Sequence, residues 1–187
     1  MSAYFWRGTL VRLRAVEPAD WETFQEWNSD SDAARETYYL PFPKSDEAAR
    51  SWAEKEATKG PENDAFRLVI ETLDGEMVGT INTHSCDPRN GTFGYGLAIG
   101  ESHRRKGYAV EAITLALRYF FGELRYQKAT VHVYSSNEPS IQLHEQLGFT
   151  LEGRLRRMIY TQGQYLDELL FGITAEEFNI AHPGSEK

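Results

Sequence analysis

Arg104-Arg105-Lys106-Gly107-Tyr108-Ala109 is the stretch of this 187-residue sequence that says most about its fold. It separates an apolar, strand-like run, Phe93 to Ile99, from a segment starting at Ala109 whose apolar residues recur at helical spacing. The first amides of a helix lack partners within the helix, and the helix dipole places partial positive charge there. A basic turn at that point is suited to phosphate, and Gly107 allows close backbone approach. With one glycine, the stretch matches neither the Rossmann fingerprint nor the P-loop.

The rest of the chain divides into short strands and helices separated by turn signals. Strands are predicted at about 10–14, 68–70, 78–83, 93–99, 129–134, 151–160 and 166–174. Helices are predicted after Pro18, from an N-cap at Ser45, over 107–121, and from Pro139 to about Gly148. Residues 28–44 are predicted to be irregular and aromatic, and 180–187 to form a tail.

This order predicts one α/β (α+β) domain over residues 1–187, with its core at about 8–175. The expected sheet is mixed, mostly antiparallel and splayed, with about seven strands flanked by about four helices. The helix 107–121 crosses between two strands, which are therefore expected to lie parallel. Ligands bind beyond the carboxyl ends of strands where the pairing splits, which places the candidate site at the basic turn.

Composition limits the classes of function. A hydrophobic content of 41% predicts a globular chain, and a net charge of −8 argues against nucleic acid as the main partner. A lone Cys86 excludes an intrachain disulfide framework and fits a reducing compartment. With no signal pattern and no membrane-length apolar run, we expect a cytoplasmic protein with no membrane partner. The five histidines and Cys86 lack metal-ligand spacing, so no metal is assigned.

Several motifs in order resemble the GNAT superfamily of N-acetyltransferases. Arg104-x-x-Gly107-x-Ala109 is similar to its acyl-CoA loop, Gln/Arg-x-x-Gly-x-Gly/Ala. Asn137-Glu-Pro-Ser140 and Leu147-Gly148-Phe149 follow at the family's expected distances and resemble its Asn-x-x-Ser/Ala and Leu-Gly-Phe elements. A further set resembles the RimJ/RimL-like branch, which acetylates N-termini of ribosomal proteins: Glu152-Gly153, Arg156, Gly163, Asp167 and the helix start Gly107-Tyr-Ala-Val-Glu111-Ala. The resemblance covers about residues 8–175.

The resemblance implies acetyl-CoA as cosubstrate and a set of residues that holds it. The amides of the turn would bind the CoA pyrophosphate, and the pantetheine arm would pair with a strand backbone and with an asparagine. These cofactor-binding residues are Leu97, Ala98, Ile99, Arg104, Arg105, Lys106, Gly107, Tyr108, Ala109 and Asn137.

Two candidate catalytic residues lie on the helix after Asn137. Ser140 matches a serine to which the branch assigns thiol stabilisation, and His144 stands where many members have a tyrosine that meets the CoA sulfur. Asn137, Ser140 and His144 are three or four residues apart, so they share one helix face. Plainer alternatives remain open: a solvated basic turn at 104–109, a helix cap at Asn137, no chemistry at Ser140, and a core or surface histidine at His144.

The general base is not assigned by these motifs. The branch carries a carboxylate on the following strand, but Ile159 occupies that position here. A water chain, Asp167, Glu168 and Glu101 remain candidates, because the substrate amine must be neutral to attack the thioester.

The acceptor is predicted to be a protein or peptide N-terminal α-amine, following the RimJ/RimL-like resemblance. Alternatives are a small amine, such as a polyamine, an amino acid or an aminoglycoside, and a CoA-binding module without turnover. Tyr38, Tyr39 and Phe42 are candidates for the wall of the substrate site, because they lie in a non-helical stretch. A homo-oligomer such as a dimer is expected by analogy alone.

Overall fold

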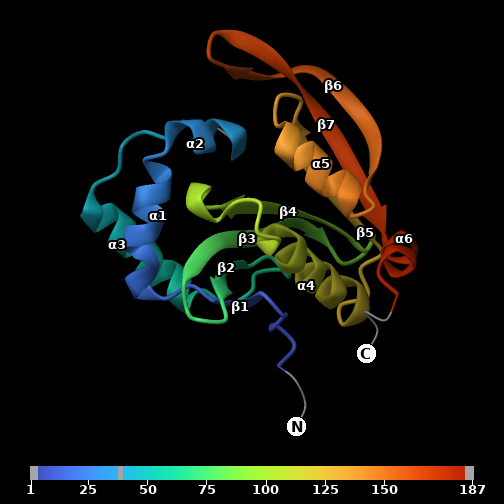
Figure 1. Ribbon diagram of the computed structural model, residues 1–187, viewed down its shortest axis with the longest axis horizontal. Coiled ribbons are helices and arrows are strands. Elements are labelled where there is room, and N and C mark those ends of the chain that lie inside the picture. The colour runs from blue at the N-terminus through green and yellow to red at the C-terminus, as the bar shows by residue number, and fades with distance from the viewer. Residues whose placement is uncertain (1–3, 38–39, 184–187) are drawn as a thin grey trace. The chain divides into compact units, whose positions relative to one another are not determined.

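The computed structural model describes residues 4–37 and 40–183. It has a seven-stranded sheet in the order β1-β2-β3-β4-β5-β7-β6 (Figure 1). The strands are β1 (Val11–Ala15), β2 (Arg67–Thr72), β3 (Met77–Asp87), β4 (Thr92–Ile99), β5 (Lys128–Tyr134), β6 (Thr150–Thr161) and β7 (Gln164–Thr174). The predicted α/β fold with a mixed sheet of seven strands is confirmed.

The described chain also contains six α-helices and two short 3-10 helices. The α-helices are α1 (Trp21–Asn28), α2 (Ser31–Thr37), α3 (Asp46–Thr58), α4 (Tyr108–Gly122), α5 (Glu138–Gln146) and α6 (Ala175–Ala181). The 3-10 helices are η1 (Pro18–Asp20) and η2 (Glu101–His103). In the ranges that the structure describes, no helix is long and apolar enough to cross a membrane.

Two helices lie where the sequence predicted none, so the expected number of four helices was wrong. α2 falls in the segment predicted to be irregular, where the Asp30 carboxylate accepts from the amides of Asp32 and Ala33, each at 3.0 Å. α6 extends to Ala181 and so enters the predicted tail. It begins with a capping box, in which Thr174 and Glu177 each accept a backbone amide of the other.

Contacts divide the chain into two compact units. The first unit comprises residues 1–83 and 96–115, and the second comprises residues 84–95 and 116–187.

In the first unit, β1, β2 and β3 form an antiparallel ladder beside α1 and α3 (Figure 1). Phe24 of α1 packs edge to face on Trp52 of α3, with ring centroids 4.8 Å apart. Val69 of β2 belongs to the same buried cluster. Trp52 therefore packs against the buried cluster of this unit, and this packing fixes the two helices against the strands.

An ion network also holds the first unit together. The Arg14 guanidinium donates to both Asp20 oxygens at 2.8 Å and to Glu71 at 2.6 Å. Arg12 donates to the same Glu71 carboxylate. Hydrogen bonds to Asp20, opposed by burial, raise the pKa of Arg14 overall, so Arg14 keeps its charge.

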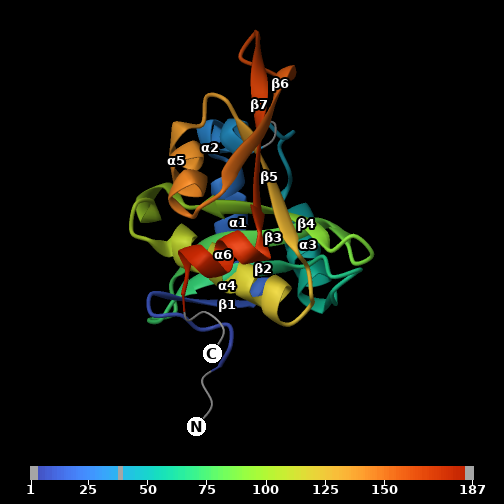
Figure 2. The ribbon, with the colours of Figure 1, turned by 90° about the vertical axis from the view of Figure 1, so that its right-hand side faces the viewer.

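In the second unit, β4 and β5 run parallel, as predicted, with Thr92–Gly94 paired to Lys128–Thr130. β5, β7 and β6 continue as an antiparallel set, and Figure 2 shows β6 and β7 as a long hairpin with α6 beside the base of β7. Phe93 of β4 stacks on Phe120 of α4 at 3.9 Å between centroids, which anchors the end of that helix on the sheet.

Candidate active site

The basic turn in the first unit leaves a row of amides without partners. Within the part of the chain that the structure describes, the amides of residues 105–110 donate no hydrogen bond, whereas the Arg104 amide donates to the Glu101 carbonyl at 3.3 Å. Five of the six predicted amides, 105–109, are therefore free. They precede and open the 15-residue α4, where the helix dipole adds partial positive charge.

Two positive φ angles shape this turn: 61° at Arg105 and 86° at Gly107. A Cβ placed on Gly107 would lie 3.2 Å from Cδ1 of Leu10. The backbone conformation favours glycine there, and a Cβ would also displace the Leu10 side chain slightly, which fits the sequence-based interpretation of Gly107.

A carboxylate one helical turn into α4 ties the turn to the start of β1. Glu111 accepts four hydrogen bonds, from the amides of Thr9, Leu10 and Val11 and from the Thr9 hydroxyl, at 2.7 to 2.8 Å. Gly8 fits against it because a Cβ there would lie 2.3 Å from the carboxyl carbon. Burial acts to raise the pKa of Glu111, but these hydrogen bonds outweigh it and lower the pKa. The sequence showed Glu111 only as part of a motif, since its partners are 100 residues away.

The side chain of Arg104 is already engaged. Its Nε donates to the Ile99 carbonyl at 3.3 Å and its Nη1 lies 3.4 Å from the Glu36 carboxylate. Arg105 and Lys106 are exposed. Of the three basic residues predicted to bind phosphate, Arg105 and Lys106 therefore have side chains that can reach a phosphate, because the Arg104 side chain is engaged.

The three predicted pantetheine-binding residues lie in the same unit. Leu97, Ala98 and Ile99 form the last part of β4 and are half-buried. The Ala98 carbonyl comes within 2.6 Å of where a Cβ on Gly79 would sit, so a glycine on β3 permits this close strand approach. Backbone pairing of this segment with a pantetheine arm stays a prediction.

In the second unit, Asn137 is the N-cap of α5. Its Oδ1 accepts from the Ser140 amide at 3.1 Å, which is the plain capping role that the sequence left open. This cap uses the single oxygen of the Asn137 side chain. The predicted hydrogen bond from Asn137 to pantetheine is not tested by this geometry.

His144 is a buried, neutral histidine. It is 6% exposed and packs among Tyr95, Phe149 and Phe171, with ring centroids 5.1 to 6.2 Å away. Burial lowers its pKa, opposed by its bond to the Ser140 backbone. Its Nδ1 lies 2.7 Å from the Ser140 carbonyl, which can only accept, so Nδ1 carries the proton.

The position of that proton limits what His144 can do. Nε2 is left with a lone pair and is buried without a hydrogen-bond partner among the described residues. A neutral ring in this tautomer can accept a proton at Nε2 but cannot donate one there. The Ser140 hydroxyl lies 3.4 Å from Nδ1, and it can direct its own proton elsewhere.

Two of the carboxylates considered as bases are held by other groups. Asp167 accepts from the Arg157 amide at 2.9 Å and the Arg154 Nε at 2.6 Å, which lowers its pKa. Glu168 lies 3.3 Å from Nδ1 of His132. Glu101 is exposed at the start of η2. Ile159, which replaces the branch's carboxylate, is half-buried in β6.

On the predicted acceptor side, Phe42 is 91% exposed. It borders a hollow of about 350 Å³ in the first unit, together with Gln25, Asn28 and the segment 40–44. Tyr38 and Tyr39 lie outside the described residues.

The structure thus combines unpaired amides at the start of α4 with a mixed sheet that contains a parallel β4–β5 pair, and comparison with known proteins shows which family has this arrangement. The family model "Acetyltransferase (GNAT) domain" matches residues 11–150. The chain is 45% identical over 182 residues, 97% of its length and 99% of the relative's, to the SPbeta prophage-derived uncharacterized N-acetyltransferase YokL of Bacillus subtilis.

More distant similarity extends to a protein with a named substrate. The spermidine N(1)-acetyltransferase of Vibrio cholerae is 25% identical over 157 residues, 84% of this chain and 88% of that one. A crystal structure of the Vibrio cholerae spermidine N-acetyltransferase with CoA and spermine superposes with a TM-score of 0.78 at 23% identity, covering 91% of this chain and 99% of that chain, which shows a shared fold.

The chain belongs to the GNAT acetyltransferase family. It is an acetyl-CoA-dependent N-acetyltransferase, as the motifs predicted.

Proposed function

We propose that this enzyme acetylates a primary amine and binds the CoA diphosphate on the turn 104–109. The observation that carries this proposal is the row of five unpaired amides, residues 105–109, at the start of α4. Phosphate oxygens would satisfy these donors, with Arg105 and Lys106 nearby to balance the charge.

The rest of the cofactor would be held by backbone and side-chain hydrogen bonds. The backbone of Leu97, Ala98 and Ile99 pairs with the pantetheine amides like an added strand, and Asn137 contributes one further hydrogen bond. These contacts orient the thioester, and orientation supplies much of the rate in a reaction that needs no further cofactor.

In the transfer step, the neutral amine attacks the thioester carbonyl carbon. The C–N bond forms, the C–S bond breaks, and CoA leaves as a thiolate. The Ser140 hydroxyl donates a hydrogen bond to that sulfur, since its proton is not committed to His144. His144 keeps its proton on Nδ1 and donates it in a hydrogen bond to the Ser140 carbonyl. This hydrogen bond holds the first turn of α5. Asp167 and Glu168 are engaged, so the amine proton leaves through water or through the exposed Glu101.

The first acceptor candidate is the N-terminal α-amine of a protein or peptide. Its support is the resemblance of Glu152-Gly153, Arg156, Gly163 and Asp167 to the RimJ/RimL-like branch.

A small-molecule amine is the second acceptor candidate. A similar protein carries the name spermidine N(1)-acetyltransferase, and the hollow beside Phe42 has the volume of a small-ligand site.

Thiol release from acetyl-CoA, measured against a panel of amines, separates these candidates. Release with peptides alone supports the first acceptor class. Release with spermidine, amino acids or an aminoglycoside supports the second. Tight CoA binding without release from any amine would show a binding module and would overturn the proposed transfer.

We also propose a cytoplasmic, homo-oligomeric protein. A single cysteine, Cys86, fits a reducing compartment. Exposed apolar side chains gather on β6 and β7: Leu151, Leu155, Met158, Tyr160 and Tyr165. Light scattering after gel filtration would show a dimer or larger species, and a monomer at all concentrations would contradict this expectation.

A further inference from the structure

A bulge in β6 places three arginines around one aspartate. Leu155 pairs with Glu168 and Ile159 with Leu166, so residues 156–158 oppose the single Asp167. Arg157 adopts a φ of 58° within this bulge. Bulges of this kind re-aim side chains and recur next to active sites.

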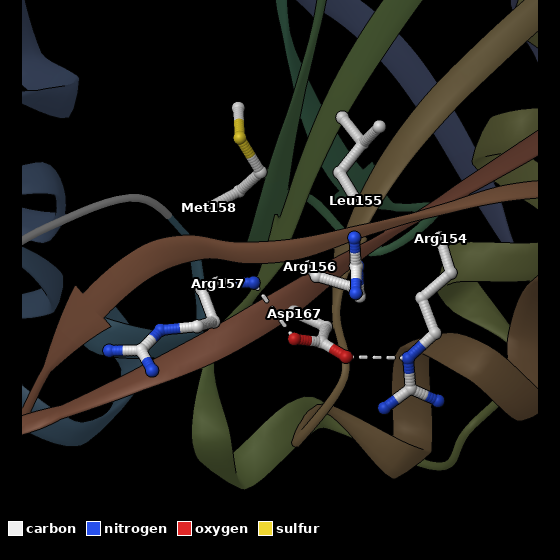
Figure 3. A pocket seen from close by; sticks show the side chains of 6 residues that line it. All are labelled: Arg154, Leu155, Arg156, Arg157, Met158 and Asp167. Carbon is white, nitrogen blue, oxygen red and sulfur yellow. Dashed lines mark hydrogen bonds and ion pairs between the residues drawn. The ribbon is translucent and has the colours of Figure 1, made fainter.

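Asp167 holds the bulge in shape. One carboxylate oxygen accepts from the backbone amide of Arg157 at 2.9 Å, and the other accepts from Nε of Arg154 at 2.6 Å (Figure 3). These bonds lower the pKa of Asp167, the Arg157 amide contributing most. The carboxylate is therefore charged and fully used in positioning its neighbours.

The three guanidinium groups of Arg154, Arg156 and Arg157 carry more positive charge than the single Asp167 carboxylate can balance. The terminal nitrogens of Arg154 point away from Asp167 in Figure 3, and the Arg157 guanidinium lies 4.6 Å above the Tyr165 ring. Arg156 has no hydrogen bond or ion pair with any residue in the described ranges. Two positive charges are thus unmatched in a chain whose net charge is −8.

Neighbouring carboxylates do not cancel this surplus. Glu168, opposite Leu155, lies 3.3 Å from His132. Glu152 forms its own ion pair with Lys128. The arginines border a shallow hollow that is open to solvent.

The bulge lies beside the end of β5, from which the chain continues into α5 and the proposed thiol-stabilising Ser140. The Asp167 carbonyl accepts from the Ser135 amide, just past the end of β5. Two residues later, Asn137 caps α5 and binds the Ser140 amide. Asp167 and Phe171 are four residues apart along β7 and so share one face of the sheet, which is the face against which His144 packs.

We propose that Arg154, Arg156 and Arg157 bind a carboxylate or phosphate group of the acceptor. The acceptor is then a primary amine with an anionic group nearby, such as an amino acid, an acidic peptide N-terminus or an aminoalkyl phosphate. Guanidinium forks match the geometry of such oxyanions. The donor's diphosphate has its own amides and cations at 104–109, which leaves this site for the acceptor. This inference rests on the proposed function and narrows its substrate class.

The test compares matched acceptors with and without the anion. β-Alanine is paired with 3-aminopropanol, and ethanolamine phosphate with ethanolamine, and kcat/KM is measured by thiol release. Wild-type enzyme should prefer the anionic member of each pair about tenfold, the effect of one good charge-assisted contact. A ratio near one in both pairs would overturn the proposal.

Arg156→Gln is the informative variant, since the Arg154 side chain also hydrogen-bonds Asp167 and the Arg157 guanidinium also packs on Tyr165. It should lower the anionic preference about fivefold. Arg89→Gln, which removes an exposed charge on the β3–β4 turn, is the matched control and should leave the ratio unchanged. An unchanged ratio in Arg156→Gln would contradict the assignment.

Two further measurements keep this inference separable from the proposed function. Binding of the same amine pairs to the CoA complex, by calorimetry, reports the anion preference even without turnover. Comparison of CoA with dephospho-CoA checks the other source of an oxyanion. If Arg156→Gln weakened CoA but not dephospho-CoA, the site would serve the donor, and the acceptor assignment would fall.

Discussion

Replacing Glu111 by alanine should cost both stability and CoA affinity. The carboxylate accepts from three consecutive backbone amides and one hydroxyl at the start of β1, and it lies one turn beyond the proposed phosphate-binding amides. We infer that it positions the turn 104–109 by fixing α4 against residues 8–11.

The loss in free energy of unfolding depends on which hydrogen-bond donors lose the Glu111 carboxylate. The Val11 amide belongs to a residue with 0% exposure, and an unsatisfied buried donor costs about 1–3 kcal/mol. Thr9 and Leu10 are exposed, so water replaces the carboxylate there at about 0.5–1 kcal/mol each. Glu111→Ala should therefore lower the free energy of unfolding by about 2–5 kcal/mol.

The stability effect should depend on pH with a definite sign. Because the folded-state pKa of Glu111 is lowered, its contribution is complete above the unfolded pKa of about 4.3 and is lost as pH falls through the folded value. Urea unfolding should show the full difference between wild type and Glu111→Ala at pH 7, and a difference that shrinks steadily as the pH falls below about 4.

Glu123→Ala is the matched control, since it removes an exposed carboxylate just after α4. It should unfold like wild type. CoA titration of folded protein should show about fivefold weaker binding for Glu111→Ala only. Equal stability and equal CoA affinity in the two variants would refute the positioning role.

Three further substitutions, one of them with a matched control variant, test the site and the fold. Gly107→Val should weaken CoA binding at least tenfold and destabilise the fold by about 1–2 kcal/mol, since φ is 86°. Gly163→Val, at φ 78° in open space, carries the same backbone strain and should bind CoA normally, so equal affinities would remove Gly107 from the cofactor site. His144→Phe should reduce kcat several-fold with unchanged CoA affinity, because α5 loses the imidazole that holds Ser140; normal turnover would assign His144 to packing alone. Arg14→Met should destabilise the protein by about 3 kcal/mol in urea unfolding, because two buried carboxylates lose their main partner, and a change below 1 kcal/mol would show that water replaces it.

Local signals predicted most of the fold. The turn signals that separate the predicted strands include Asp74-Gly75 and Asn90-Gly91, which lie between neighbouring strands of the sheet, and both glycines have positive φ. Ser45 was predicted as a cap and accepts from the Ala48 amide at 3.2 Å. These features depend on a few adjacent residues, so periodicity and turn chemistry were sufficient to find them.

The two missed helices had weaker signals. α2 has seven residues in a segment without a clear apolar period, and α6 has seven residues just after a long strand. Its capping box, Thr174 with Glu177, was visible in the sequence and should have predicted the helix start.

The sequence by itself determined the family, the succession of strands along the chain and the basic turn that opens α4. Each of these depends on residues that are close together along the chain. Tertiary structure decided the partners of Glu111, the proton position on His144 and the arginine bulge around Asp167. These depend on which distant backbone groups meet a side chain and on an irregular strand register. Neither can be read from residue spacing, because hydrogen bonds and charge balance are set by proximity in space.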